Sequence, residues 1–104
     1  MKYKVVISES AYNEITECIS FVSNVSIIAA KELYVEIMAA INSLSEMPER
    51  CSTCNRLKNP FGATRKLLIA NGRYAALFRI NNDKVLINYF LDLRQKKYSK
   101  YAIE

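Results

Sequence analysis

Hydrophobic periodicity changes character halfway along this chain of 104 residues. Before residue 48, apolar residues recur at helical spacing in two stretches, whereas after residue 64 the pattern is that of β-strands. The first stripe consists of Ala11, Ile15, Cys18, Ile19 and Val22, and the second of Ala30, Leu33, Ile37, Ile41 and Leu44. Because only Asn24-Val25-Ser26 separates them, the sequence predicts an antiparallel helical hairpin, capped at Ser8 or Ser10 and at Ser26.

Strand-like segments flank this helical hairpin. Four runs are rich in β-branched or aromatic residues or alternate between apolar and other residues: 2–8, 65–70, 74–80 and 85–91. Asn71-Gly72 is the strongest short signal for a β-hairpin turn. The sequence therefore predicts one α+β domain over residues 1–104. Its order is β-α-α-β-β-β, with an N-terminal strand and the helical hairpin packed on an antiparallel sheet.

Positive charge is concentrated in the second half of the chain. Residues 1–49 hold three Lys or Arg against seven Asp or Glu, a balance of −4, whereas residues 50–104 hold twelve against three, a balance of +9. A field of one sign steers polyanions or acidic proteins toward that half. A solvated basic surface without any partner would have the same composition, so this pattern alone leaves both interpretations open.

The residue types present limit the chemistry. Histidine is absent, so acid–base catalysis near neutral pH would need other groups with large pKa shifts, and Ser-His-Asp and Cys-His arrangements are excluded. Cys51-Ser-Thr-Cys54 has the spacing of half a zinc site, but Cys18 alone cannot complete four ligands. We therefore expect ordinary loop cysteines, no metal site and no cofactor.

The sequence also predicts a compartment. No apolar run approaches the roughly 18 residues that span a bilayer. The first four residues, Met-Lys-Tyr-Lys, lead into a strand-like run rather than the apolar core of a signal peptide. We therefore expect a cytoplasmic protein that has no membrane partner.

Four segments, in this order and spacing, carry a resemblance to a known family. They are YKVVISESAYNEI (3–15), AINSLSEMPER (40–50), RKLLIANGRYAALFRI (65–80) and DKVLINYFLDLRQ (83–95). Together they resemble the RelE/ParE superfamily of toxins of type II toxin–antitoxin systems, which includes plasmid stabilisation proteins. The resemblance implies a growth-inhibiting toxin that a cognate antitoxin neutralises. It also implies that operator DNA is contacted only through the antitoxin complex.

Two branches of that superfamily imply two mechanisms. The RelE-like branch is a metal-independent endoribonuclease that cleaves mRNA in the ribosome with a central-strand Arg and basic or Tyr side chains near the C-terminus. On this chain the resemblance places those catalytic roles on Arg65, Arg79, Arg94, Tyr98 and Tyr101. The ParE-like branch poisons DNA gyrase by binding it and performs no chemistry of its own.

The sequence favours the ParE-like branch. The catalytic branch often has an arginine directly after the hairpin tyrosine, but here Ala75 follows Tyr74, while Arg73 and Arg79 are displaced along the strand. Arg65 is a further candidate for that side of the sheet.

Binding to a target or antitoxin is the other role expected of the basic half. The candidate residues for it are Arg65, Arg73, Arg79, Arg94, Lys96 and Lys97. Tyr74, Phe78 and Tyr89 are expected to pack in the core or across strands. A non-toxic member that only binds its partner and represses its own operon is a third possibility.

Overall fold

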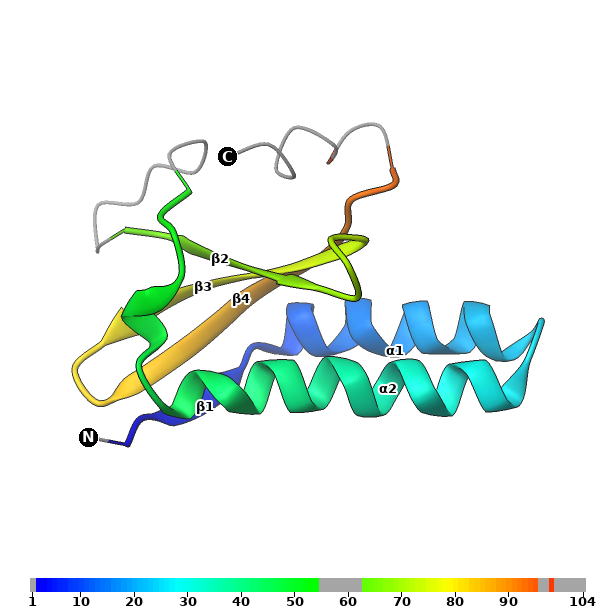
Figure 1. The fold of residues 1–104 in the computed structure, drawn as a ribbon, viewed down its shortest axis with the longest axis horizontal. Helices are drawn as coiled ribbons and strands as arrows, with labels where there is room; N and C mark the ends of the chain where they lie inside the picture. The colour runs from blue at the N-terminus through cyan, green and yellow to red at the C-terminus, as the bar shows by residue number, and fades with distance from the viewer. Residues whose placement is uncertain (1, 55–62, 96–97, 99–104) are drawn as a thin grey trace.

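The computed structural model describes residues 2–54, 63–95 and 98. A four-stranded sheet lies on a hairpin of two helices (Figure 1). The sheet order is β1 (Lys4–Ile7), β4 (Lys84–Asp92), β3 (Tyr74–Asn81) and β2 (Arg65–Ile69). The meander β2-β3-β4 is antiparallel, and β1 pairs with β4 in parallel at one edge. The α+β fold is confirmed, and the parallel pairing of β1 is a feature that the sequence pattern did not place.

Both helices begin at the predicted serine caps. Helix α1 (Glu9–Ser23) starts after Ser8, whose hydroxyl accepts a hydrogen bond from the Ala11 amide at 3.0 Å. Helix α2 (Ile27–Asn42) starts after Ser26, whose hydroxyl accepts from the Ala29 amide at 3.1 Å. Such caps satisfy amides that have no partner in the first helical turn. Two short 3₁₀ turns, η1 (Ser43–Ser45) and η2 (Pro48–Arg50), follow α2.

The main core lies between the sheet and the helical hairpin. Both predicted stripes contribute to it, and Ile37 and Ile41 are fully buried against residues of β3 and β4 such as Phe78 and Ile87. The alternation of β3 is as predicted, with Tyr74, Ala76, Phe78 and Ile80 on the helix side of the sheet.

A second, smaller apolar cluster lies on the opposite face of the sheet. It consists of Cys54, Ala75, Leu77, Leu91 and Leu93, with Tyr98 packed against it. Cys51, in contrast, belongs to the core on the helix side. Both cysteines lie outside helices and strands, as the sequence predicts, and neither forms a disulfide with another described residue. Both are buried, and they pack on opposite faces of the sheet.

The predicted Asn-Gly turn joins β2 to β3, but its loop is longer than the two-residue type. Residues 70–73 lie between the last pair of the ladder, Ile69 with Tyr74. Ala70, Asn71 and Gly72 all have left-handed backbones, with φ of 57°, 56° and 81°. Asn and Gly adopt this conformation readily, whereas Ala70 does so at a cost of about 1–2 kcal/mol.

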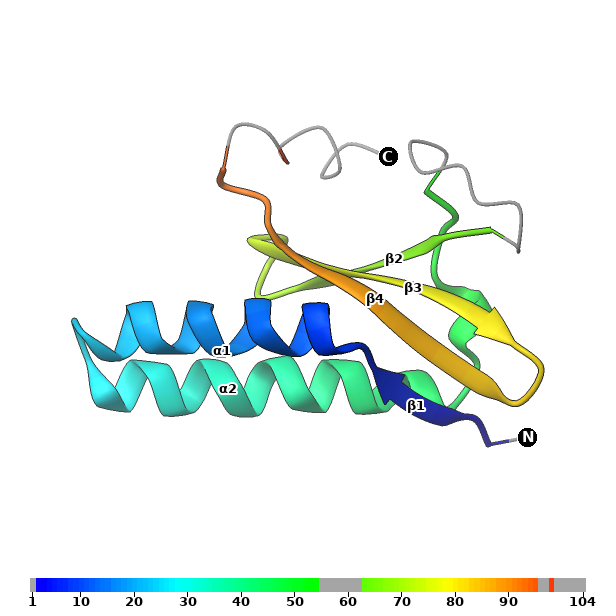
Figure 2. The same ribbon diagram turned by 180° about the vertical axis from the view of Figure 1, so that it is seen from behind.

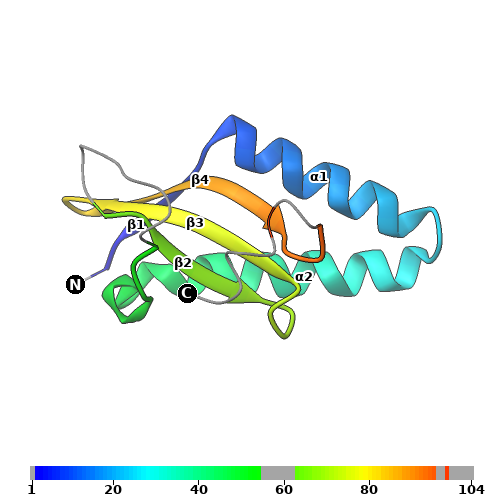
Figure 3. The same cartoon turned by 90° about the horizontal axis from the view of Figure 1, so that it is seen from above.

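The sheet covers only part of the helical hairpin. Figures 2 and 3 show the end of α1 and the start of α2 projecting beyond the β2–β3 turn, while the other half of the hairpin lies beneath the strands. No helix within the described residues is long and apolar enough to cross a membrane. The candidate site lies where the sheet ends and the projecting part of the helical hairpin begins.

Candidate functional site

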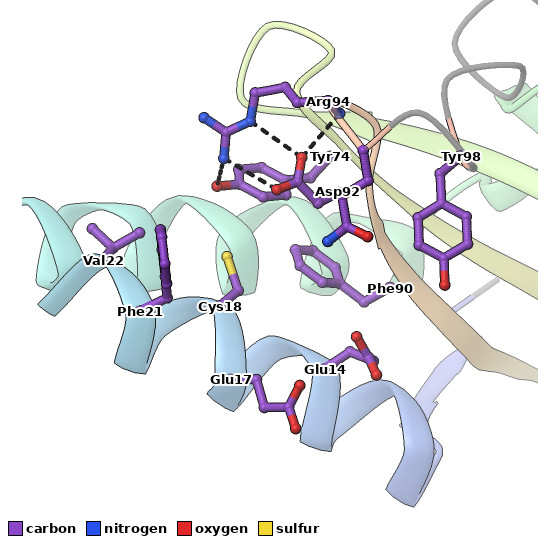
Figure 4. Close-up of a pocket in the computed structure, with 11 residues that line it drawn as sticks. Glu14, Glu17, Cys18, Phe21, Val22, Tyr74, Phe90, Asp92, Arg94 and Tyr98 are labelled. Carbon is purple, nitrogen blue, oxygen red and sulfur yellow. Dashed lines mark hydrogen bonds and ion pairs between the residues drawn. The ribbon is translucent and has the colours of Figure 1, made fainter. Parts of the chain in front are cut away.

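Two pockets meet where the sheet ends above the helices. The first, of about 320 Å³, lies between α1 and the end of β4 (Figure 4). The second, of about 390 Å³, lies between the two helices and the β2–β3 turn. Both are lined by Phe21, Val22, Tyr74 and Arg94. We call the two together the corner groove.

Arg94 forms the polar wall of the corner groove. Its Nη2 donates to the Tyr74 hydroxyl at 2.8 Å, and its Nε and backbone amide donate to Asp92 Oδ1 at 3.1 and 2.9 Å (Figure 4). The hydrogen bond with Asp92 raises the pKa of Arg94, whose charge is therefore permanent. The guanidinium carbons of Arg94 and Arg73 lie 5.3 and 5.8 Å from the centre of the Tyr74 ring. The two guanidinium groups thus form cation–π contacts with one aromatic ring.

Tyr74 links this wall to the core. Its ring stacks on Phe90 at a centroid distance of 5.4 Å. Burial, followed by a hydrogen bond with the Cys18 thiol, raises the pKa of Tyr74 to about 12. Burial also raises the pKa of Cys18. Both groups therefore stay protonated at neutral pH, so neither is suited to act there as a general base.

The floor of the corner groove is apolar and its helical edge is acidic. Phe21 and Val25, at the projecting end of the hairpin, are 73% and 85% exposed. Asp92 of β4 is paired with Arg94, and the other carboxylates of the lining come from the helices: Glu14 and Glu17 in the first pocket, and Glu32 and Glu36 in the second. Figure 4 shows Glu14 and Glu17 across the first pocket from Arg94. The corner groove therefore offers an apolar strip between an acidic and a basic edge.

The structure brings together only some of the predicted binding and catalytic residues. Arg73 and Arg94 meet in the corner groove. Tyr98 lines the first pocket and packs against the smaller cluster. Lys96, Lys97 and Tyr101 lie outside the described residues.

Arg65 and Arg79 lie on opposite faces of the sheet. Arg65 pairs with Phe78 on the helix side, where its Nη1 donates to the carbonyls of Glu49 and Cys51 at 3.1 and 2.6 Å. Arg79 pairs with Leu86 on the other face, and its buried Nε has no hydrogen-bond partner among the described residues. Neither of these two arginines lines either pocket of the corner groove.

Ala75 occupies the position at which the RelE-like branch often has arginine. It is fully buried, packed in the smaller cluster with Cys54, Leu77 and Leu91. An arginine here would be surrounded by apolar side chains, where an unpaired charge is costly.

Sequence reasoning missed several residues of the corner groove. Phe21 lies beside the predicted stripe of α1, and Val25 was assigned only to the break between the helices. These two large apolar residues lie near the end of α1 and outside its core stripe, and that position could have indicated an exposed binding surface. Asp92 had a signal too, because an acidic residue two positions before Arg94 can fix its guanidinium.

Comparison with known proteins gives one kind of match. No family model matches the chain, and no curated protein matches it. Among solved structures, the chain is similar to one described as "Chromosomal ParDE TA system from P. aeruginosa". The TM-score is 0.68 at 13% identity, over 86% of this chain and 94% of that one. The chain has a ParE-like fold. The fold implied by the sequence resemblance is thereby confirmed.

Proposed function

We propose that this chain is the toxin of a type II toxin–antitoxin module. In this proposal it inhibits growth by binding DNA gyrase, as ParE-like toxins do, and a cognate antitoxin neutralises it. The ParE-like fold and the four resembling segments support the assignment to such modules. Binding rather than catalysis is supported by the arrangement of the candidate side chains.

The dispersal of the candidate catalytic residues carries this proposal. Arg65 is occupied by two backbone carbonyls, Arg79 lies on the other face, and Arg94 is paired with Asp92 at the end of the sheet. An endonuclease needs its cations and its proton-transfer groups around one phosphate. Tyr74, the tyrosine that Arg94 contacts, has a pKa of about 12 and is a poor base. A surface that binds a protein needs no such convergence.

The corner groove is the proposed contact for the antitoxin. Two adjoining pockets with a shared apolar floor suit an amphipathic helix, whose side chains at positions i, i+4 and i+7 enter such grooves. The acidic and basic edges of the corner groove would also fix how the antitoxin helix is oriented in it. The antitoxin helix would present basic residues toward Glu14, Glu32 and their neighbours, and acidic residues toward Arg73 and Arg94.

One observation favours the RelE-like alternative. Arg79 lies beside Leu77 on the sheet face opposite to the helices, and its Nε has no partner among the described residues. The Nε atom is buried, so a phosphate would have to be held by the terminal nitrogens of this guanidinium, a group suited to binding phosphate. Ribosome-dependent cleavage of mRNA therefore remains the second candidate function, with Arg79 as its central residue.

Inducible expression in a bacterial host separates these functions. We expect growth arrest, induction of the DNA-damage response and intact mRNA, with Arg79→Ala as toxic as the parent chain. Rapid cleavage of mRNA that Arg79→Ala abolishes would replace the gyrase proposal with the RelE-like function. Normal growth at confirmed expression would leave a member that only binds its partner.

A further inference from the structure

We propose that two copies of this chain pair through the side of the helical hairpin that none of the four described strands covers. A shallow hollow of about 560 Å³ marks this surface. Among the described residues its lining comes from the two helices alone, whereas Tyr74 of β3 lines both pockets of the corner groove. The lining residues are Ile19, Ser23, Ile27, Ala30, Lys31, Tyr34 and Val35, and we call them the outer helical face.

Helix α2 has the apolar composition of a helix that is buried on two opposite sides. Only three of its 16 residues are charged: Lys31, Glu32 and Glu36. Its buried stripe faces the core, yet Ile27 and Val35 on the outer helical face are 65% and 66% exposed. A helix that is apolar nearly all round is normally buried on all sides, and contiguous exposed apolar surface marks an interaction site.

The small number of charged residues on the outer helical face favours a second copy of this chain as the partner that covers it. Lys31 is the one charged residue that lines the outer helical face, in a chain whose residues are 24% charged. A two-fold interface sets a surface against itself, so a face with many charges of one sign would repel its copy. A face that is apolar apart from one lysine is close to self-complementary. A different protein recognised by charge would find both signs in the corner groove and almost none here.

The size of the surface fits a weak dimer. Ile27, Tyr34, Val35 and the aliphatic part of Lys31 offer on the order of 500 Å² per copy. Two such faces bury about 1,000 Å², the lower end for a specific interface. Facing helical hairpins would form a four-helix arrangement, a packing that helices with apolar stripes adopt readily. Interfaces of this size can have dissociation constants near the micromolar range.

Sedimentation equilibrium of the purified full chain tests this pairing, at roughly 1 to 200 µM to bracket a weak dissociation constant. We expect the mass to rise with concentration from 11.9 kDa toward twice that value. Val35→Glu and Ile27→Glu each place a carboxylate in the interface, and we expect each to raise the dissociation constant at least tenfold. Val25→Glu, at an 85% exposed position in the corner groove, is the matched control and should dimerise like the parent chain.

The comparison needs variants that fold. All three positions are exposed. Circular dichroism and the thermal unfolding midpoint should therefore match those of the parent chain at a concentration where the parent chain is monomeric, because dimerisation itself raises the midpoint. A parent chain that stays monomeric throughout would overturn the proposal, as would a dimer that survives both Val35→Glu and Ile27→Glu. Dissociation by Val25→Glu alone would also overturn it, by moving the contact to the corner groove. Neither target nor antitoxin enters this measurement, so it is independent of the proposed function.

Discussion

The half of the helical hairpin beneath the sheet and the half that projects beyond it contain the same kinds of residue in different surroundings. Beneath the sheet, Ile15, Ile37 and Ile41 are at most 1% exposed. At the projecting end, Val25 and Ile28 are 85% and 72% exposed. Apolar side chains stabilise a fold only where something covers them. The first half therefore contributes stability, and the second is available to partners.

The largest effect should come from the covered half. Ile37→Ala leaves a cavity in the fully buried core and should lower the free energy of unfolding by about 2–5 kcal/mol. Ile28→Ala removes the same atoms from an exposed position and should change it by less than about 0.5 kcal/mol. Chemical denaturation of the two variants measures both values. Equal losses would show that the projecting half is covered within a single copy of the chain.

The projecting half should instead govern partner binding. Val25→Glu places a carboxylate on the apolar floor of the corner groove, beside Glu32, and should weaken antitoxin binding at least tenfold, about 1.4 kcal/mol. Ile28→Glu, three residues along the chain and also exposed, should leave the affinity unchanged. Calorimetric titration with an antitoxin identified by its rescue of growth provides the affinities. A tenfold loss with Ile28→Glu but not with Val25→Glu would move the antitoxin contact away from the corner groove.

The junction between the halves should show an intermediate effect. Tyr74→Phe removes the hydroxyl that accepts from Arg94 at 2.8 Å, and should cost about 1 kcal/mol of stability. The ring and its stacking on Phe90 are retained, so a loss near that of Ile37→Ala is not expected. Denaturation at neutral pH measures it. No change in stability would mean that the Arg94 contact contributes nothing in solution.

The smallest effect is expected outside the helical hairpin, where the residue before β1 meets the turn η2. The Tyr3 hydroxyl donates to Glu49 Oε2 at 2.6 Å, and this hydrogen bond lowers the pKa of Glu49. A carboxyl with a lowered folded-state pKa stabilises the fold above its unfolded pKa of about 4.3, and this stability is lost as the pH falls.

Tyr3→Phe removes that linkage. The unfolding midpoint of the variant should therefore fall less steeply than that of the parent chain below about pH 4.5, and the difference should be small because the hydrogen bond is exposed to solvent. Unfolding curves recorded between about pH 3 and 7 test this. A steeper fall in the variant would contradict the assigned cause of the Glu49 shift.

The covered half could largely be predicted from the sequence. Helical spacing, serine caps and strand alternation are local patterns, and residues such as Ser8 and Ile41 take the expected places. The fold class followed from the order of these patterns along the chain.

The projecting half could not be predicted in the same way. The corner groove depends on where the sheet ends above the helices, which brings Phe21 and Arg94 together across most of the chain. Likewise, the burial of Ala75 depends on Cys54, a residue that belongs to no strand and packs against the same face of the sheet. Such long-range contacts leave no periodic signal.

The central claim is that this chain inhibits DNA gyrase by binding it and does not cleave mRNA. An experiment with purified components tests this claim most directly. The chain would be mixed with DNA gyrase and relaxed plasmid, and in parallel with ribosomes that translate a defined mRNA. We expect supercoiling to be lost and gyrase-linked DNA breaks to accumulate with increasing concentration of the chain, while the mRNA stays intact. Cleaved mRNA together with unaffected gyrase would contradict the account.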